Sequence, residues 1–256
     1  MQITKFLAYL LFSSFILISC SDDDDNNPLS NALQADNQRP LGSSANALLS
    51  SNTFTSLTIE MVSVQGFEPT TTAVNAFKQF LEERLFKPDG ITINQRSVPS
   101  SNTAPFSIEE ISEIENNTRS LFNVGDEITV YVYFADGSRE DDTNVQVTLG
   151  TAYRNTSMVI YEGTLRQLST RPNSPLLSTI ETATLNHEFS HLLGLVNIGT
   201  PLQSDHEDQD ANGHCNVQSC LMEAAIEFGS GMMGLGDMVP ELDAQCIADL
   251  QANGGR

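Results

Sequence analysis

Histidine is concentrated in one short part of this sequence. All four histidines of the 256-residue chain lie between positions 187 and 214. Neutral imidazole is the commonest side-chain ligand for metal ions in proteins. The clustering therefore indicates a metal site rather than histidines scattered over a surface.

The first two histidines belong to the segment His187-Glu188-Phe189-Ser190-His191. Residues four apart share one face of a helix, so both imidazoles can reach a single ion. Glu188 stands beside the first ligand. This is the HExxH arrangement, in which Zn²⁺ lowers the pKa of a water molecule and the glutamate accepts its proton. The pattern predicts a hydrolytic zinc centre with Glu188 as the catalytic base.

A turn signal follows the second histidine. Gly194 comes three residues after His191, where a glycine can end the helix and turn the chain back toward the metal. The segment HEFSHLLG resembles the metzincin zinc peptidases, whose motif continues as HExxHxxGxxH. Asn197 stands where that longer motif has its third histidine. The third ligand must therefore come from another part of the chain.

A later block supplies the main candidate for that ligand. His214 is followed at once by Cys215, and then by Cys220 and Met222. This order is similar to the archaemetzincins, in which the third histidine precedes a cysteine and then a Cys-x-Met sequence. The resemblance implies that His214 completes the zinc site after an insertion, residues 196–213, and that Met222 is the Met-turn methionine. A long loop costs little entropy, so the insertion is compatible with the site.

The insertion contains a rival ligand and a second pattern. His206 lies among acidic residues of this loop and is the alternative third zinc ligand. Asp208, Asp210 and Asn212 match the opening of a calcium loop, but Ser219 stands where that pattern needs a bidentate glutamate. A Ca²⁺ site at these three residues therefore competes with a simple solvated turn.

The cysteines also have two alternative uses. Archaemetzincins hold a second, structural zinc on four cysteines, of which the later two form a CxxC pair. Here the corresponding segment reads Asp243-Ala244-Gln245-Cys246, so one cysteine is missing. An oxidising compartment favours a disulfide over an incomplete zinc site. We expect Cys215 to pair with Cys220, or either of them with Cys246.

The N-terminus carries a targeting pattern. Residues 1–19 combine one lysine with a short apolar run, as in a signal peptide, and the run ends in Leu17-Ile18-Ser19-Cys20. This ending resembles the bacterial lipobox, which implies that Cys20 is lipidated. Polar and acidic residues dominate the next segment, so we expect 20–53 to be a flexible tether and 54–256 the catalytic domain.

Hydrophobic periodicity outlines the elements that would position the site. Apolar runs predict strands at 56–64, 90–98, 127–134, 145–149 and 158–161. Helical spacing and start signals predict helices at 73–85, from Ser107 onward, from Pro175 to Leu195, and at 239–251. The order indicates an α+β fold, a mixed twisted sheet with packed helices. It is similar to metzincins, which implies an active-site helix, a small C-terminal helical subdomain, and a substrate lying along an edge strand at 145–149 or 158–161.

Charge and motifs together lead to one function and one alternative. With 33 acidic against 12 basic residues, the formal charge of −21 argues against nucleic-acid binding. We expect a monomeric zinc metalloendopeptidase that cleaves peptide or protein substrates. The lipid would anchor it to the outer membrane of a Gram-negative bacterium, facing the periplasm or the cell surface. The alternative is a non-catalytic surface lipoprotein that keeps a peptidase-like fold as a protein- or metal-binding module.

Overall fold

The computed structural model describes residues 34–143, 146–230, 236 and 238–256. Its centre is a five-stranded sheet in the order β2-β1-β3-β5-β4. β1, β2, β3 and β5 run parallel, and β4 pairs antiparallel with β5. The strands are β1 (Ser56–Val64), β2 (Gly90–Val98), β3 (Glu127–Phe134), β4 (Gly150–Arg154) and β5 (Ser157–Ile160).

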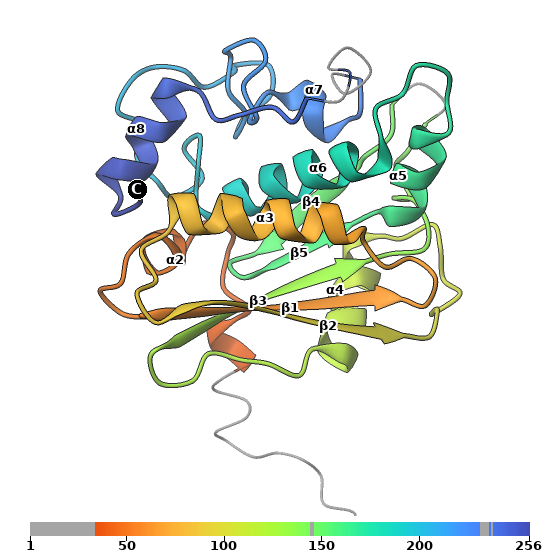
Figure 1. Cartoon of the computed structure of the whole chain (residues 1–256), viewed down its shortest axis with the longest axis horizontal. Coiled ribbons are helices and arrows are strands. Elements are labelled where there is room, and N and C mark those ends of the chain that lie inside the picture. Colours follow the sequence, from red (N-terminus) through yellow and green to blue (C-terminus); the bar gives the residue numbers. More distant parts are fainter. Residues whose placement is uncertain (1–33, 144–145, 231–235, 237) are drawn as a thin grey trace, which may run out of the picture.

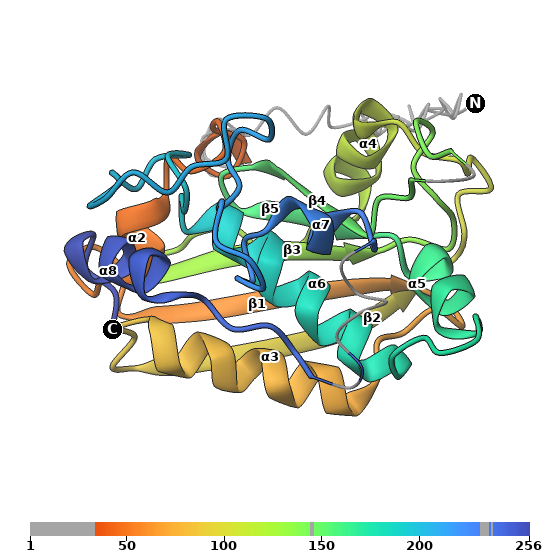
Figure 2. The same cartoon turned by 90° about the horizontal axis from the view of Figure 1, so that it is seen from above.

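Seven helices are assigned in the described part of the chain: α2 (Ala45–Leu49), α3 (Thr71–Arg84), α4 (Ile108–Thr118), α5 (Glu162–Ser169), α6 (Leu177–Leu192), α7 (Ala224–Glu227) and α8 (Ala244–Ala252). α3 and α6 cover one face of the sheet, α4 lies on the other, and α7 and α8 lie above α6 (Figure 1). Seen from above, α6 runs between α3 and the β5–β4 side of the sheet (Figure 2). The predicted α+β class is confirmed.

Alternating side chains along the strands build a core on each face of the sheet. On β3, Val130 and Val132 join the large core beneath α3 and α6, whereas Tyr131 and Tyr133 join a smaller core that contains Ile111 of α4. Successive strand residues point to opposite faces, so a continuous apolar strand must be covered on both sides. This double burial explains why the run EITVYVYF carries no polar alternation.

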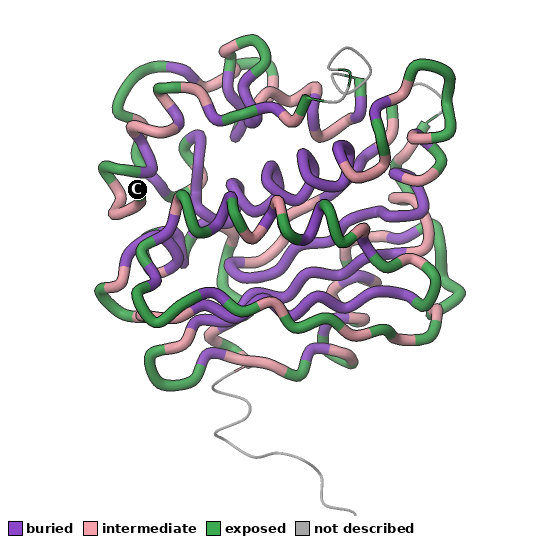
Figure 3. The backbone as a smooth tube through the Cα atoms, viewed as in Figure 1, coloured by how far each residue is buried: buried purple, intermediate pink, exposed green. Residues whose placement is uncertain are grey.

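α6 is the central element and carries the HExxH segment. Its residues from Thr179 to Leu192 are all buried, as Figure 3 shows for the helix at the middle of the molecule. A helix with no solvent-facing stripe belongs in the interior of a fold. It follows Pro175 and ends at Leu192, and Gly194 then turns the chain with a φ of 72°. An alanine at Gly194 would place its Cβ 2.7 Å from the backbone nitrogen of Thr200, so the turn requires glycine.

Most of the predicted elements are confirmed, including the strands at 56–64, 90–98 and 127–134 and the capping box that begins α4 at Ser107. The strand predicted at 145–149 is wrong over 146–149, and Val145 lies outside the described residues. The backbone N–H groups there bond outside the sheet: Thr148 donates to Asp142 Oδ1 and Leu149 to the carbonyl of Glu227. The true edge strand is β4, residues 150–154. The C-terminal helix is shorter than 239–251 and begins at Ala244.

The boundary of the predicted tether also needs correction, because residues 34–53 belong to the folded domain. Leu48 and Leu49 are fully buried. The ammonium of Lys87 donates to the backbone carbonyls of Ala47, Ser50 and Phe54 at 2.6–2.8 Å, which ties this segment to the domain. The average polarity of the segment concealed the apolar pair Leu48-Leu49, which is buried in the large core. The predicted signal peptide, Cys20 and the acidic run lie outside the described residues.

None of the helices in the described ranges has the length and apolar character that a bilayer crossing requires.

Candidate metal centre

Three of the four histidines meet at one point above α6. His187 and His191 lie one turn apart on the helix, and their Nε2 atoms are 3.1 Å from each other. The ring of His214 lies 5.4 Å from that of His187 and 5.1 Å from that of His191, centroid to centroid. The structure therefore brings together the three histidines that the sequence motif indicates as zinc ligands.

The segment that follows His214 holds two of these rings in place. The backbone N–H of Cys215 donates to the carbonyl of Met222 at 2.7 Å, which pairs the chain beside His214 with the predicted Met-turn. The carbonyl of the next residue back, Leu221, accepts from Nδ1 of His187 at 2.7 Å. This bond leaves Nε2 of His187 as the nitrogen with a free lone pair. Histidines that bind a metal are commonly oriented by such a hydrogen bond from their other ring nitrogen. Met222 itself is fully buried in the large core.

Glu188 projects from the same turn of α6 toward the edge strand. Its Oε2 atom accepts a hydrogen bond of 2.8 Å from the backbone N–H of Ala152 on β4, and its Oε1 atom has no partner. Gly150 of β4 permits this approach, because a Cβ there would lie 2.6 Å from Cγ of Glu188. Burial raises the pKa of Glu188 well above its ordinary value, and the nearby carboxylate of Glu227 adds to this effect. A carboxyl group whose pKa is raised in this way is a better proton acceptor than an ordinary glutamate, as general base catalysis requires.

Glu227 is the residue of this site that the sequence motifs missed. It ends the one-turn helix α7, and its Oε2 atom lies 2.8 Å from Nε2 of His214. The candidate ligand atoms of His187, His191, His214 and Glu227 all lie within 4.8 Å of one another. No spacing rule indicates a carboxylate at this position after Met222, so only the folded chain reveals it.

The donor atoms fit a zinc ion. Tetrahedral Zn²⁺ with nitrogen ligands at 2.0–2.1 Å requires ligand atoms about 3.3–3.4 Å apart, close to the His187–His191 separation. Burial lowers the pKa of His187 to about 4 and that of His191 well below its ordinary value, so both imidazoles are neutral, as a metal ligand must be. Nδ1 of His191 and both ring nitrogens of His214 are buried without a hydrogen-bond partner. Buried polar atoms in such number call for a bound group.

Comparison with known proteins agrees with this picture at the level of the fold. No family model matches the chain, and no curated protein sequence does so. Among solved structures, archaemetzincin from Methanopyrus kandleri matches 78% of this chain and 96% of its own, with 17% sequence identity and a TM-score of 0.51. The fold is similar to that of archaemetzincin. Metalloproteinase-II from Bacteroides fragilis matches 78% of this chain and 54% of its own, with 16% identity and a TM-score of 0.44.

A second cluster lies at the side of the domain and contains His206. Its Nδ1 atom is 3.3 Å from Sγ of Cys215 and 3.9 Å from Sγ of Cys246. Cys220 Sγ lies 3.8 Å from Cys246 Sγ, and Asp243 Oδ2 accepts from Cys215 Sγ at 3.1 Å. The structure thus places His206 with the cysteines and Asp243, away from the site on α6. The fold therefore does not bring His206 to His187 and His191, where the alternative prediction placed it as the third ligand.

The disulfide predicted among Cys215, Cys220 and Cys246 is absent, because all three cysteines are free. Cys215 and Cys246 converge with His206 and Asp243, and Sγ of Cys220 lies 3.8 Å from Sγ of Cys246. A hydrogen bond from Cys215 lowers the pKa of the Cys220 thiol, and a hydrogen bond from Cys246 adds to this effect. Both bonds favour the thiolate form of Cys220.

The calcium pattern has no support in the structure. Oδ1 of Asp208 accepts from the backbone N–H of Asp210 at 2.9 Å. Neither aspartate belongs to either of the two metal-ligand clusters found among the described residues. The segment is therefore a turn stabilised by its own side chain. Asn197, at the position of the missing histidine, adopts a positive φ of 67° and donates to Glu207 Oε2 in the same loop.

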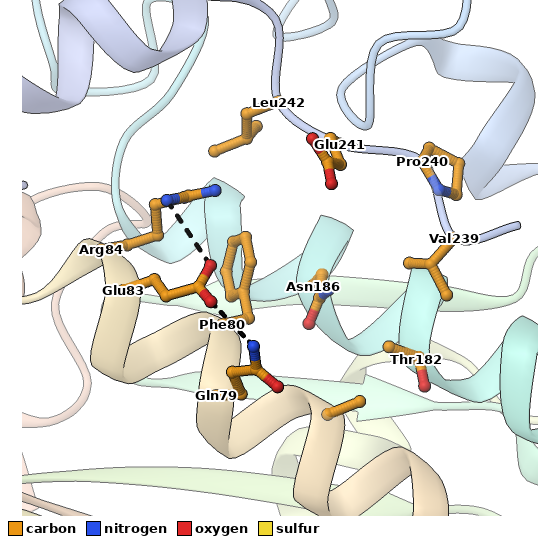
Figure 4. Close-up of a pocket in the computed structure, with 11 residues that line it drawn as sticks. Gln79, Phe80, Glu83, Arg84, Thr182, Asn186, Val239, Pro240, Glu241 and Leu242 are labelled. Carbon is orange, nitrogen blue, oxygen red and sulfur yellow. Dashed lines mark hydrogen bonds and ion pairs between the residues drawn. The ribbon is translucent and has the colours of Figure 1, made fainter.

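A groove of about 220 Å³ lies between α3, α6 and the segment 239–242 (Figure 4). Phe80, Arg84, Asn186 and Leu242 are among its lining residues. None of the residues that line it belongs to either cluster, so the groove is a separate feature. Asn186 precedes His187 in sequence but faces α3 instead of the histidines.

Proposed function

We propose that this chain is a zinc-dependent metalloendopeptidase. The observation that carries the proposal is the convergence of three imidazoles from α6 and the segment after the insertion, beside a buried glutamate with one unpartnered oxygen. The archaemetzincin-like fold is consistent with it. His187, His191 and His214 would hold the ion, which when bound supplies a Lewis acid for the scissile carbonyl and for water.

The residues around the ion would transfer the proton and hold the catalytic side chains in place. Glu188 accepts the proton of the attacking water at its unpartnered Oε1 and then delivers it to the leaving amine. The N–H of Ala152 holds the other oxygen, so the carboxylate does not rotate away from the site. The carbonyl of Leu221 keeps His187 in the tautomer that a metal ligand needs.

We propose β4 as the strand that receives the substrate. It is an edge of the sheet, it runs antiparallel to its neighbour, and Ala152 on it already contacts Glu188. An extended peptide can add to such an edge through its backbone, with its scissile bond beside the histidines.

The second cluster is proposed to bind a structural metal ion. Zinc with sulfur ligands at about 2.3 Å places them about 3.8 Å apart, the separation seen between Cys220 and Cys246. His206 completes the set, and its Nε2 bonds Asp249 Oδ2 at 2.8 Å, a carboxylate partner that fixes a ligating ring. This site would join the insertion, the Met-turn and α8.

Lipid anchoring through Cys20 and placement in the outer membrane, facing the periplasm or the cell surface, also form part of the proposal. Asn37, near the start of the described chain, bonds Asn123 and Thr156, and Gln38 bonds Asn116 of α4. α4 covers the face of the sheet opposite α6 and α7 (Figure 1). An anchor at this face would leave the histidine site turned away from the membrane. A Cys20→Ser variant should therefore leave the membrane fraction while retaining its metal.

The test of the enzyme is metal content and cleavage of an unstructured protein, labelled casein, by the full chain in detergent. Wild type should bind two zinc ions and cleave; His214→Ala should retain one and cleave nothing. Glu188→Ala should retain both ions and lose cleavage. If wild type binds metal yet cleaves no better than Glu188→Ala, the chain is a binding module instead of a peptidase.

A further inference from the structure

Glu227 lies outside every motif of the sequence, yet its carboxylate completes the histidine cluster. Together with the three histidines it forms a set of four ligand atoms within 4.8 Å of one another. Its Oε2 atom is 2.8 Å from Nε2 of His214, but that nitrogen has no partner with hydrogen-bond geometry. This is expected of two ligand atoms that point at a shared ion instead of at each other.

The charges of the site support the same conclusion. Glu188 and Glu227 lie close enough to influence each other. Among the described residues neither carboxylate forms an ion pair with a lysine or arginine, and Arg139 acts on Glu188 only from a longer distance. Glu188 is buried and Glu227 is half-buried, and removing a carboxylate from water without a cation beside it is costly. A divalent ion among the three imidazoles would compensate both carboxylates.

Glu188 is not the carboxylate that would bind the ion. It follows His187 directly on α6, and its Oε2 atom is engaged by the N–H of Ala152. Glu227 instead belongs to α7, which lies above the helix that supplies two of the histidines (Figure 1). The two glutamates therefore have different positions relative to the ion.

We infer that Glu227 is the fourth protein ligand of this centre, which is closed when no substrate is present. The inference rests on the zinc site proposed above. Zinc sites with four protein ligands are structural and inert, whereas catalytic sites keep one position open for water or substrate. For cleavage, the carboxylate of Glu227 must leave, displaced by an oxygen ligand such as the scissile carbonyl of a peptide.

The surroundings of Glu227 allow its side chain to move while its backbone stays in place. The carbonyl of Glu227 accepts from the N–H of Leu149 at 2.9 Å, and the preceding Ile226 is buried in the large core. The carboxylate has no partner but His214 among the residues that the structure describes. Rotation about the side-chain bonds alone would therefore open the centre.

The experiment uses the full chain loaded with Co²⁺, whose visible absorption reports the number and type of ligands. Glu227→Gln should change that absorption, weaken zinc binding at least tenfold, and bind acetohydroxamate, an oxygen chelator, at least tenfold more tightly than wild type. Glu223→Gln is the matched control, since this carboxylate accepts from the N–H of Ser219 in the same segment, outside the cluster. It should match wild type in all three measurements.

An unchanged cobalt spectrum with unchanged zinc affinity in Glu227→Gln would overturn the inference. So would chelator binding equal to wild type, even if cleavage falls, because Glu227 would then act on the reaction instead of blocking it. Absence of any bound metal in wild type would refute both proposals. Failure of the peptidase proposal alone has a different signature: casein stays intact in every variant while the spectral difference persists. Thermal unfolding of each variant checks that it is folded.

Discussion

Gly150 offers the sharpest test of how the fold positions the catalytic base. A Cβ at this position would lie 2.6 Å from Cγ of Glu188 and 2.9 Å from Cγ2 of Thr184. The φ of Gly150 is not in the left-handed region, so the backbone itself tolerates alanine. The effect of Gly150→Ala therefore comes from the added methyl group pressing on α6.

The size of the effect follows from the burial of the neighbours. Thr184 and Glu188 are each about 1% exposed and cannot move into solvent. Overpacking of this kind costs about 1–3 kcal/mol, and in a chain of this size each kcal/mol lowers Tm by about 2–4 °C. To reach ordinary contact at 3.4 Å, Glu188 must shift by about 0.8 Å. A misplacement of about 1 Å can cost about 100-fold in rate.

The assay compares kcat/KM on labelled casein with Tm and zinc content. Gly150→Ala should lose about 100-fold in kcat/KM and keep its zinc. Gly137→Ala is the control, since its Cβ would lie 2.4 Å from the Cβ of Ala104, a close approach that does not involve Glu188. It should lose stability without losing cleavage beyond the fraction unfolded. Wild-type kcat/KM in Gly150→Ala, or an equal loss in both variants, would refute the reasoning.

Three further predictions concern the scaffold. Phe189 is fully buried and packs edge-on against Phe77 with ring centroids 5.5 Å apart, so Phe189→Ala should cost about 3–5 kcal/mol in urea unfolding. Burial raises the pKa of Glu162 to about 8. The stability that comes from its protonated form is therefore complete below pH about 4.5 and is lost as the pH rises toward 8. Glu162→Gln should flatten this part of the profile of unfolding free energy against pH. Glu115 forms a buried ion pair with Arg119 at 2.8 Å. Glu115→Ala should therefore lower the free energy of unfolding by about 3–5 kcal/mol, measured by chemical denaturation. A loss below about 1 kcal/mol would show that the arginine finds other partners.

The sequence by itself determined the features that depend on neighbours along the chain. The four-residue spacing of His187 and His191 places both on one helix face whatever the rest of the fold does. Gly194 marks the end of the helix because glycine readily adopts the positive φ that this turn requires. The capping box at Ser107 and the doubly buried strand 127–134 could be predicted from the sequence for the same reason. Their signals lie within a few residues of the structure they specify.

Only the tertiary structure decided which distant groups meet. His206 and His214 lie in one polar stretch, but the pairing of Cys215 with the carbonyl of Met222 directs His214 to α6, and Asp249 of α8 captures His206. The missing disulfide has the same origin, since thiols that converge with an imidazole and a carboxylate have partners other than each other. Contacts of this kind join residues far apart in sequence, and no local periodicity or spacing encodes them. Glu227 follows the same rule: its carboxylate acquires a role only where α7 folds over the histidines.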